Sequence, residues 1–155
     1  LSLVERLNAD KLVVQLAALL HDIGRVKYGP KDHEETGAKE AEKILQTLEF
    51  PDEIVEKVKE CILYHRHKDS TIPQSLEAKI VKIADAWAHF KKPLETLAVK
   101  VRFGDGNIAD DIDWLKKKLK RDLEFLKNIR KEVEIDDIID ECKEKYKCVL
   151  RLLEY

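Results

Sequence analysis

The pair His21-Asp22 combines an imidazole and a carboxylate at the end of a long apolar segment. A carboxylate at the edge of an apolar core is costly unless a cation or hydrogen bonds compensate its charge. Imidazole nitrogen and carboxylate oxygen together suit divalent ions such as zinc, manganese and iron. An aspartate that merely ends a helix beside a surface histidine is the other interpretation of the pair.

Three further residues fall where they could complete a metal site. Asp85 shares a helical face with Val81 in an apolar segment, so an ionised carboxylate there needs a cation or several hydrogen bonds. His65 ends the apolar stripe of one expected helix, and His33 begins another. Each of these histidines alone is more often structural than a ligand. Together with His21-Asp22 they form a set suited to one or two metal ions.

The segments that carry these residues are predicted to be helical. Only five glycines and four prolines interrupt the chain, and the apolar residues between them recur with helical spacing. No segment alternates as a strand does, so the predicted fold class is all-α. Helices are expected from Asp10 to about His21, from about His33 to Leu48, from Pro51 to His65, from Ser75 to about Phe90, and from Leu94 to Gly104.

Local signals add detail to these helices. Asp10 and Ser75 are good N-cap residues for the helices that follow them. The helix after Asp10 is apolar on nearly all sides, which predicts a central, buried position. The segment from Gly24 to Pro30 is predicted to be a loop.

The last third of the chain differs in pattern. After the turn signal Asp105-Gly106-Asn107, apolar residues recur at spacings of three and four from Ile112 to Val133 and again from Ile135 to Leu153. We therefore expect a metal-binding helical domain at residues 1–106 and two amphipathic helices at residues 107–155. These helices either pack on the domain or form a surface for association, for example between copies of the chain.

Composition excludes several classes of protein. The chain has 155 residues, a formal net charge of −2 and 44% hydrophobic residues, which favours one globular domain over a disordered chain or a general nucleic-acid-coating protein. The basic cluster Lys116–Lys118 is interpreted as the polar face of a helix. Three cysteines without a CxxC motif form no disulfide framework, and no apolar run is long enough to cross a bilayer. A cytoplasmic location is expected.

Four motifs in order resemble one known family. The segment LLHDIGR at residues 19–25 resembles the signature of the HD-domain superfamily of metal-dependent phosphohydrolases, in its HDIG form. His33 in DHEETGA, His65 in ILYH and Asp85 in KIADA resemble the later motifs of that family. The resemblance extends from about Leu12 to Phe90.

The resemblance implies an all-α helical bundle with a central metal site for one or two divalent ions, drawn from Mn, Fe, Zn, Ni, Co and Mg. It assigns five residues as metal ligands, namely His21, Asp22, His33, His65 and Asp85. Asp22 would also be the catalytic residue that bridges two metals and orients the nucleophile. His33 and His65 resemble the extra ligands of members with a two-metal centre.

Two positions depart from the family pattern. The family has another ligand histidine on a helix before the doublet, but no histidine precedes His21 in this sequence, and we expect it upstream of Leu1. Many members with two metals carry adjacent histidines, whereas this chain has His65-Arg66-His67. His65 is preferred because it continues the apolar stripe, and His67 is the second candidate.

The function implied is hydrolysis of a phosphate ester or anhydride, of a nucleotide above all, by metal-activated water. The expected partner is therefore a small phosphorylated substrate. The cations expected to hold its phosphate are Arg25, Lys27, Lys31, Arg66, Lys68 and Lys82. Solvated surface charge is the alternative for each of them.

A non-catalytic helical module that binds a nucleotide or a protein is the rival hypothesis, kept open by the absent first histidine. Other enzyme classes lack support. Gly104-Asp105-Gly106 has neither the lysine nor the helical context of a phosphate-binding loop. Cys61 falls on a core face, where a thiol is a poor nucleophile.

Overall fold

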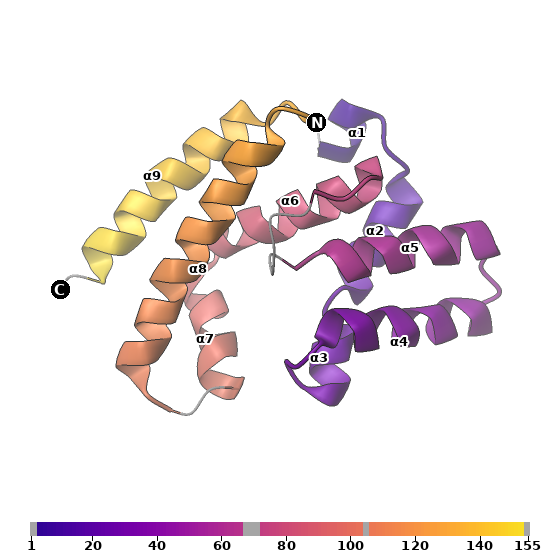
Figure 1. The fold of residues 1–155 in the computed structure, drawn as a ribbon, viewed down its shortest axis with the longest axis horizontal. Coiled ribbons are helices and arrows are strands. Elements are labelled where there is room, and N and C mark those ends of the chain that lie inside the picture. Colours follow the sequence, from indigo (N-terminus) through magenta and orange to yellow (C-terminus); the bar gives the residue numbers. More distant parts are fainter. Residues whose placement is uncertain (1–2, 67–71, 104–105, 154–155) are drawn as a thin grey trace. The chain divides into compact units, whose positions relative to one another are not determined.

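The computed structural model describes residues 3–66, 72–103 and 106–153, and this part of the chain contains helices and no strand (Figure 1). The predicted all-α class is therefore confirmed. The helices are α1 (Leu3–Leu7), α2 (Lys11–Leu20), α3 (Ile23–Tyr28), α4 (His33–Thr47), α5 (Asp52–Tyr64), α6 (Leu76–Lys91), α7 (Pro93–Phe103), α8 (Ile108–Ile129) and α9 (Asp136–Leu152). None of these described helices is apolar over the length that a bilayer span requires.

The chain divides into two compact units, Leu1–Lys82 and Ile83–Tyr155, and the boundary falls inside α6. The domain boundary expected from the sequence lies after residue 106, in the turn before α8, and therefore differs from this boundary between units. The expected boundary stays a prediction. Because each unit has its own contacts, the two are described separately below.

The first unit is built around α4, which lies beside both α3 and α5, while α2 lies beside α5 (Figure 1). These helices and the first turns of α6 share one apolar core. Its fully buried members include Val13, Ala17, Ala41, Leu45, Val58, Cys61, Ile62 and Ile80. The unit thereby holds the ends of α2, α4 and α5 in fixed positions.

Helix α2 begins as predicted but is less buried than predicted. The Asp10 carboxylate accepts hydrogen bonds from the backbone N–H groups of Leu12 and Val13, which confirms the N-cap. Leu12 is 46% exposed and Leu19 79% exposed, so the expectation of burial on all sides is wrong. A small unit covers only one side of this helix, the side that carries Val13, Val14 and Ala17.

The predicted loop after Asp22 is wrong, because residues 23–28 form helix α3. Gly24 is buried in the contact between α3 and α4, where an added Cβ would lie 2.5 Å from the backbone nitrogen of Gly37 and 2.6 Å from Thr36 Oγ1. The glycine therefore permits close helix packing. The chain leaves α3 at Gly29, whose φ of +89° favours glycine.

The second unit contains the two predicted amphipathic helices, α8 and α9, which pack against each other, while α7 also packs on α8. Asn107 caps α8 by accepting hydrogen bonds from the N–H groups of Ala109 and Asp110. The apolar stripes of both helices are buried. They include Leu115, Leu119, Leu126, Ile129, Ile138, Ile139 and Cys142.

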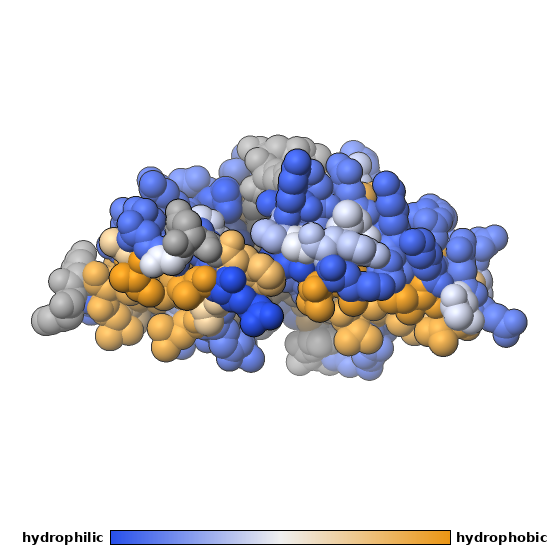
Figure 2. Space-filling model, turned by 90° about the horizontal axis from the view of Figure 1, so that it is seen from below, coloured by the Kyte–Doolittle hydropathy of each residue, from blue (hydrophilic) through white to orange (hydrophobic). Residues whose placement is uncertain are grey.

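Some large apolar side chains remain mostly exposed. On the face drawn in Figure 2, hydrophobic residues (orange) lie beside hydrophilic ones (blue). Among the described residues, the large apolar side chains that are more than half exposed are Leu19, Val26, Tyr28, Leu48, Leu94, Ile108 and Leu152. They belong to both units.

Candidate metal centre

Three helix ends in the first unit carry the polar side chains of the candidate site. His21 is the C-cap residue of α2, and Asp22 occupies the next position, immediately before α3. His33 is the first residue of α4, and His65 is the C-cap residue of α5. Since α4 packs against both α3 and α5, these ends meet.

The donor atoms of three of these residues converge. Asp22 Oδ1 lies 3.2 Å from His33 Nε2 and 3.8 Å from His65 Nε2. The two Nε2 atoms lie 3.3 Å apart, and each of the three residues offers a ligand atom within 4.8 Å of the others. Both histidines are buried. The predicted convergence of Asp22, His33 and His65 is therefore present.

His21 lies at the same place. Its Nε2 atom is 3.7 Å from Asp22 Oδ2, and its ring meets the His65 ring edge-on at a centroid distance of 5.3 Å. The three imidazoles and one carboxylate thus come from three separate segments of the chain.

Backbone carbonyl groups orient all three imidazoles. In each case Nδ1 lies within hydrogen-bond distance of the carbonyl oxygen three residues earlier. The distances are 2.8 Å from His21 to Ala18, 3.0 Å from His33 to Pro30 and 2.6 Å from His65 to Ile62. A carbonyl oxygen only accepts, so Nδ1 carries the hydrogen and the neutral ring presents a lone pair on Nε2.

This arrangement fits a divalent cation. The lone pairs on Nε2 of His33 and His65 face one another and the Asp22 carboxylate, which is unfavourable unless positive charge lies near them. Asp22 Oδ1 is buried and has no hydrogen-bond partner among the described residues. Imidazole nitrogens whose other N–H is held by a carbonyl, together with a carboxylate, form a typical ligand set for Zn, Mn, Fe and related ions.

Arg25 is a cation that lies against these atoms. Its Nη2 donates to His33 Nε2 at 2.9 Å, and its Nε lies 3.3 Å from Asp22 Oδ1. Burial raises the pKa of the Asp22 carboxyl, but neighbouring groups, among them the positively charged Arg25 guanidinium, outweigh burial and hold that pKa well below its usual range. Asp22 is therefore ionised at neutral pH and available as a ligand.

The other predicted phosphate-binding cations lie in varied surroundings. Lys27 and Tyr28 both donate to the buried Glu40 carboxylate, which ties α3 to α4. Arg66 donates to the buried Glu34 carboxylate at 2.7 Å.

Two further lysines complete this group. Lys31 is exposed in the turn before α4, and Lys82 is buried on α6. Lys68 and the second-choice ligand His67 lie outside the described residues.

Asp85 belongs to the second unit. It lies on α6, with its Oδ1 atom 3.6 Å from Nε2 of His89 on the same helix. Val81, which shares its helical face, is buried, but Ala84 and Ala88 on the same face are exposed, so the apolar segment around Asp85 is only partly buried. A role for Asp85 as a ligand stays a prediction.

Sequence reasoning missed several supporting residues. The sequence predicts a loop at Gly24, although a glycine in the HDIG motif beside a second glycine-containing motif is a signal of close packing. Glu34 and Glu40 are buried, and nothing in the local sequence distinguishes them from the exposed glutamates near them. Only their burial identifies them as partners of Arg66 and Lys27.

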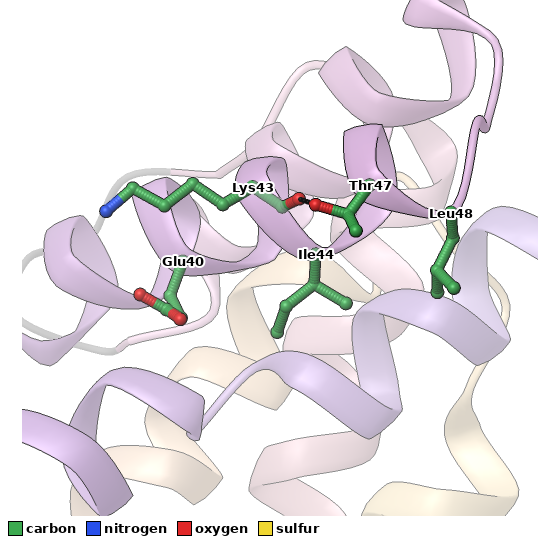
Figure 3. Close-up of a pocket in the computed structure, with 5 residues that line it drawn as sticks. All are labelled: Glu40, Lys43, Ile44, Thr47 and Leu48. Carbon is green, nitrogen blue, oxygen red and sulfur yellow. Dashed lines mark hydrogen bonds between the residues drawn. The ribbon is translucent and has the colours of Figure 1, made fainter.

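A shallow groove of about 310 Å³ lies along α4 (Figure 3). It is lined by Glu40, Lys43, Ile44, Thr47 and Leu48. The Thr47 hydroxyl donates to the Lys43 carbonyl, and the Glu40 carboxylate already accepts from Lys27 and Tyr28. None of the predicted site residues lines this groove.

Comparison with known proteins supplies one match. A family model described as HD domain matches residues 1–88, which include His21, Asp22, His33, His65 and Asp85. No solved structure matches the chain.

Proposed function

Because this chain belongs to the HD-domain superfamily of metal-dependent phosphohydrolases, we propose that it hydrolyses a phosphate ester or anhydride at the centre formed by its histidines and Asp22. The single observation that carries the proposal is the convergence of His33 Nε2, His65 Nε2 and Asp22 Oδ1. The ending of a helix does not require that side-chain donor atoms from three separate segments converge, whereas the binding of a metal ion does.

The ligands of the proposed centre are His21, Asp22, His33 and His65, with Asp85 as a fifth on the strength of its sequence motif. One or two divalent ions are proposed, drawn from Mn, Fe, Zn, Ni, Co and Mg. When bound, a divalent ion supplies Lewis acidity and lowers the pKa of water. The low pKa of the Asp22 carboxyl keeps this ligand ionised at neutral pH.

Besides its contacts with His33 and Asp22, we propose that Arg25 also binds the phosphate of the substrate. A guanidinium can donate two parallel hydrogen bonds to a phosphate, and Arg25 already lies against two proposed ligands. Arg66, Lys31, Lys27 and Lys82 are proposed as further contacts. The substrate class is a small phosphorylated compound, and a nucleotide is the preferred candidate.

The test replaces Asp22 and measures metal and hydrolysis separately. Asp22→Ala is expected to lower the affinity for added Mn²⁺ by more than about 100-fold, because loss of an outer-sphere partner alone costs 10- to 100-fold. Hydrolysis of a panel of nucleotides and other phosphoesters, with Mn, Co, Ni and Mg supplied in turn, is expected to be lost as well. Metal content and thermal stabilisation by the ion are the first measurements.

Asp140→Ala is the matched control, because it removes the same charge from an exposed carboxylate of α9. It should retain both metal and hydrolysis. Full turnover by Asp22→Ala would refute the assigned role. A wild-type protein that binds metal but hydrolyses nothing in the panel would instead favour the non-catalytic module.

A further inference from the structure

Arg25 of α3 lies against the proposed metal ligands, within the first unit. Its Nη2 atom donates a hydrogen bond of 2.9 Å to Nε2 of His33, the first residue of α4. Its Nε atom lies 3.3 Å from Oδ1 of Asp22, the residue that precedes α3. The guanidinium therefore contacts the ligand atoms of two proposed ligands at once.

The lone pair on Nε2 of His33 can serve only one partner. Nδ1 of the same ring lies 3.0 Å from the Pro30 carbonyl oxygen, which only accepts, so Nδ1 carries a hydrogen. A guanidinium has donors and no acceptor, so the bond from Arg25 uses the single lone pair of the opposite nitrogen. A metal ion bound to this imidazole needs the same lone pair. Arg25 and a metal ion therefore cannot both bind Nε2 of His33.

The guanidinium satisfies the cluster only in part. Nε2 of His65 lies 3.3 Å from Nε2 of His33, and both nitrogens converge with Oδ1 of Asp22. Among the described residues, Asp22 Oδ1 and Arg25 Nε are buried atoms without a hydrogen-bond partner. A divalent ion can accept lone pairs from imidazole and carboxylate ligands together. It is therefore a better partner for the three converging atoms than one guanidinium.

We propose that Arg25 competes with the metal ion for His33, and that metal binding releases the guanidinium to the phosphate of the substrate. This inference rests on the proposed function, in which His33 is a ligand and Arg25 a phosphate contact. The Arg25 side chain is 27% exposed, so part of it already lies at the surface. Once it leaves His33, both of its Nη groups are available to a phosphate. Arg25 thereby couples metal binding to phosphate binding.

Arg25→Leu tests the competition, because leucine retains an apolar stem but has neither the charge nor the donors. Mn²⁺ affinity of the full chain is measured by chelator competition. The variant is expected to bind Mn²⁺ about 10-fold or more tightly than wild type, because a hydrogen bond to a charged group contributes about that factor to an equilibrium constant. If Arg25 instead held Asp22 and His33 in place for the ion, the variant would bind Mn²⁺ more weakly.

Stability is measured alongside affinity, as the unfolding midpoint of the metal-free protein. Equal or weaker Mn²⁺ binding by Arg25→Leu at an unchanged midpoint would overturn the proposal. Arg25→Gln retains a polar side chain and replaces Arg25→Leu if the latter is less stable than wild type. The same gain in affinity is expected of Arg25→Gln, and its absence counts equally against the competition.

Lys39→Leu is the matched control, because Lys39 is an exposed cation of α4 in the same unit. It removes one positive charge and introduces the same side chain, so Mn²⁺ affinity should equal that of wild type. A similar gain in Lys39→Leu and Arg25→Leu would assign the effect to net charge and contradict competition for one lone pair.

Inorganic phosphate tests the release of the guanidinium. In wild type, Arg25 gains a new partner when the ion and phosphate are both bound. Phosphate is therefore expected to raise the Mn²⁺ affinity of wild type by a larger factor than that of Arg25→Leu. An equal factor in both proteins would show that the released guanidinium does not bind phosphate, and would refute that part of the proposal.

The comparison with wild type distinguishes failure of this inference from failure of the proposed function. If neither wild type nor Arg25→Leu binds Mn, Co, Ni or Mg, the converging residues are not a metal site and the proposed function is wrong. If both proteins bind Mn²⁺ with equal affinity, the metal site stands and the competition alone is wrong.

Discussion

At the scale of single residues, the candidate centre depends on carbonyl groups that helices leave unpaired. The last carbonyl oxygens of an α-helix have no N–H partner within the helix. Ala18 and Ile62 lie in the last turns of α2 and α5, and their oxygens accept from His21 and His65. A histidine placed just after a helix can therefore be oriented by that helix, with Nε2 directed away from it.

Gly24 illustrates how a residue without a side chain supports the same centre. Its backbone lies against the start of α4, near the carbonyl group of His33. We expect Gly24→Ala to lower the free energy of unfolding by about 1–3 kcal/mol, because the added methyl group must displace rigid backbone. Denaturant unfolding measures this change. Weaker Mn²⁺ binding should accompany it, since α4 carries His33.

Gly29→Ala is the control for this prediction. An added Cβ at Gly29 meets no atom within 4 Å, but the positive φ remains unfavourable for alanine. A loss of about 1 kcal/mol is expected from backbone strain alone, with Mn²⁺ affinity unchanged. Wild-type stability and metal affinity in Gly24→Ala would show that α3 and α4 are not tightly packed at this point.

At the scale of elements, the short helix α3 is stabilised mainly by its contacts with the neighbouring helix α4. Helix α3 has six residues, too few to be stable in isolation. It is held by the packing of Gly24 on α4 and by the bonds from Lys27 and Tyr28 to Glu40. This dependence on α4 explains why local sequence signals indicated a loop.

The N-cap of α2 offers a test at this scale. Asp10→Ala is expected to lower the free energy of unfolding by about 1 kcal/mol, because two N–H groups at the start of α2 lose their acceptor. Denaturant unfolding of the whole chain is the measurement. Asp10→Ser preserves an acceptor and should retain most of the stability; equal losses in both variants would argue against capping as the cause.

At the scale of the whole molecule, the burial of the three cysteines shows whether each unit has a closed core. All are free, with Cys61 buried in the first unit, Cys142 buried in the second and Cys148 exposed. Burial raises the pKa of Cys61 and of Cys142 to about 12, so both thiols stay protonated at pH 8. Neither buried thiol is suited to nucleophilic chemistry in the folded protein.

We therefore predict that one thiol reacts rapidly with dithionitrobenzoate at pH 8 and that the other two react only after unfolding. The rapid reaction should disappear in Cys148→Ser. Persistence of the rapid reaction in that variant would show that one of the two units opens readily in solution, because a buried thiol reacts only when its surroundings open.

Association through the C-terminal helices stays a prediction, and gel filtration of the full chain tests it. A cytoplasmic location also stays a prediction.

The sequence alone determined the properties that depend on neighbours along the chain. Helical spacing of apolar residues predicted the helices that begin near Asp10, His33, Asp52, Ser75 and Leu94, because periodicity and capping are local. The order of four short motifs likewise identified the family and nominated His21, Asp22, His33, His65 and Asp85. Contact between distant segments was not needed for these predictions.

The tertiary structure alone decided which atoms meet. Helix α3, the burial of Glu34 and Glu40, and the one-sided burial of α2 follow from packing between segments that the sequence does not place together. The same holds for the approach of Asp22 to His65 and for the link from Asp122 to His89. Each depends on distances across the fold, and periodicity along a chain contains no information about such distances.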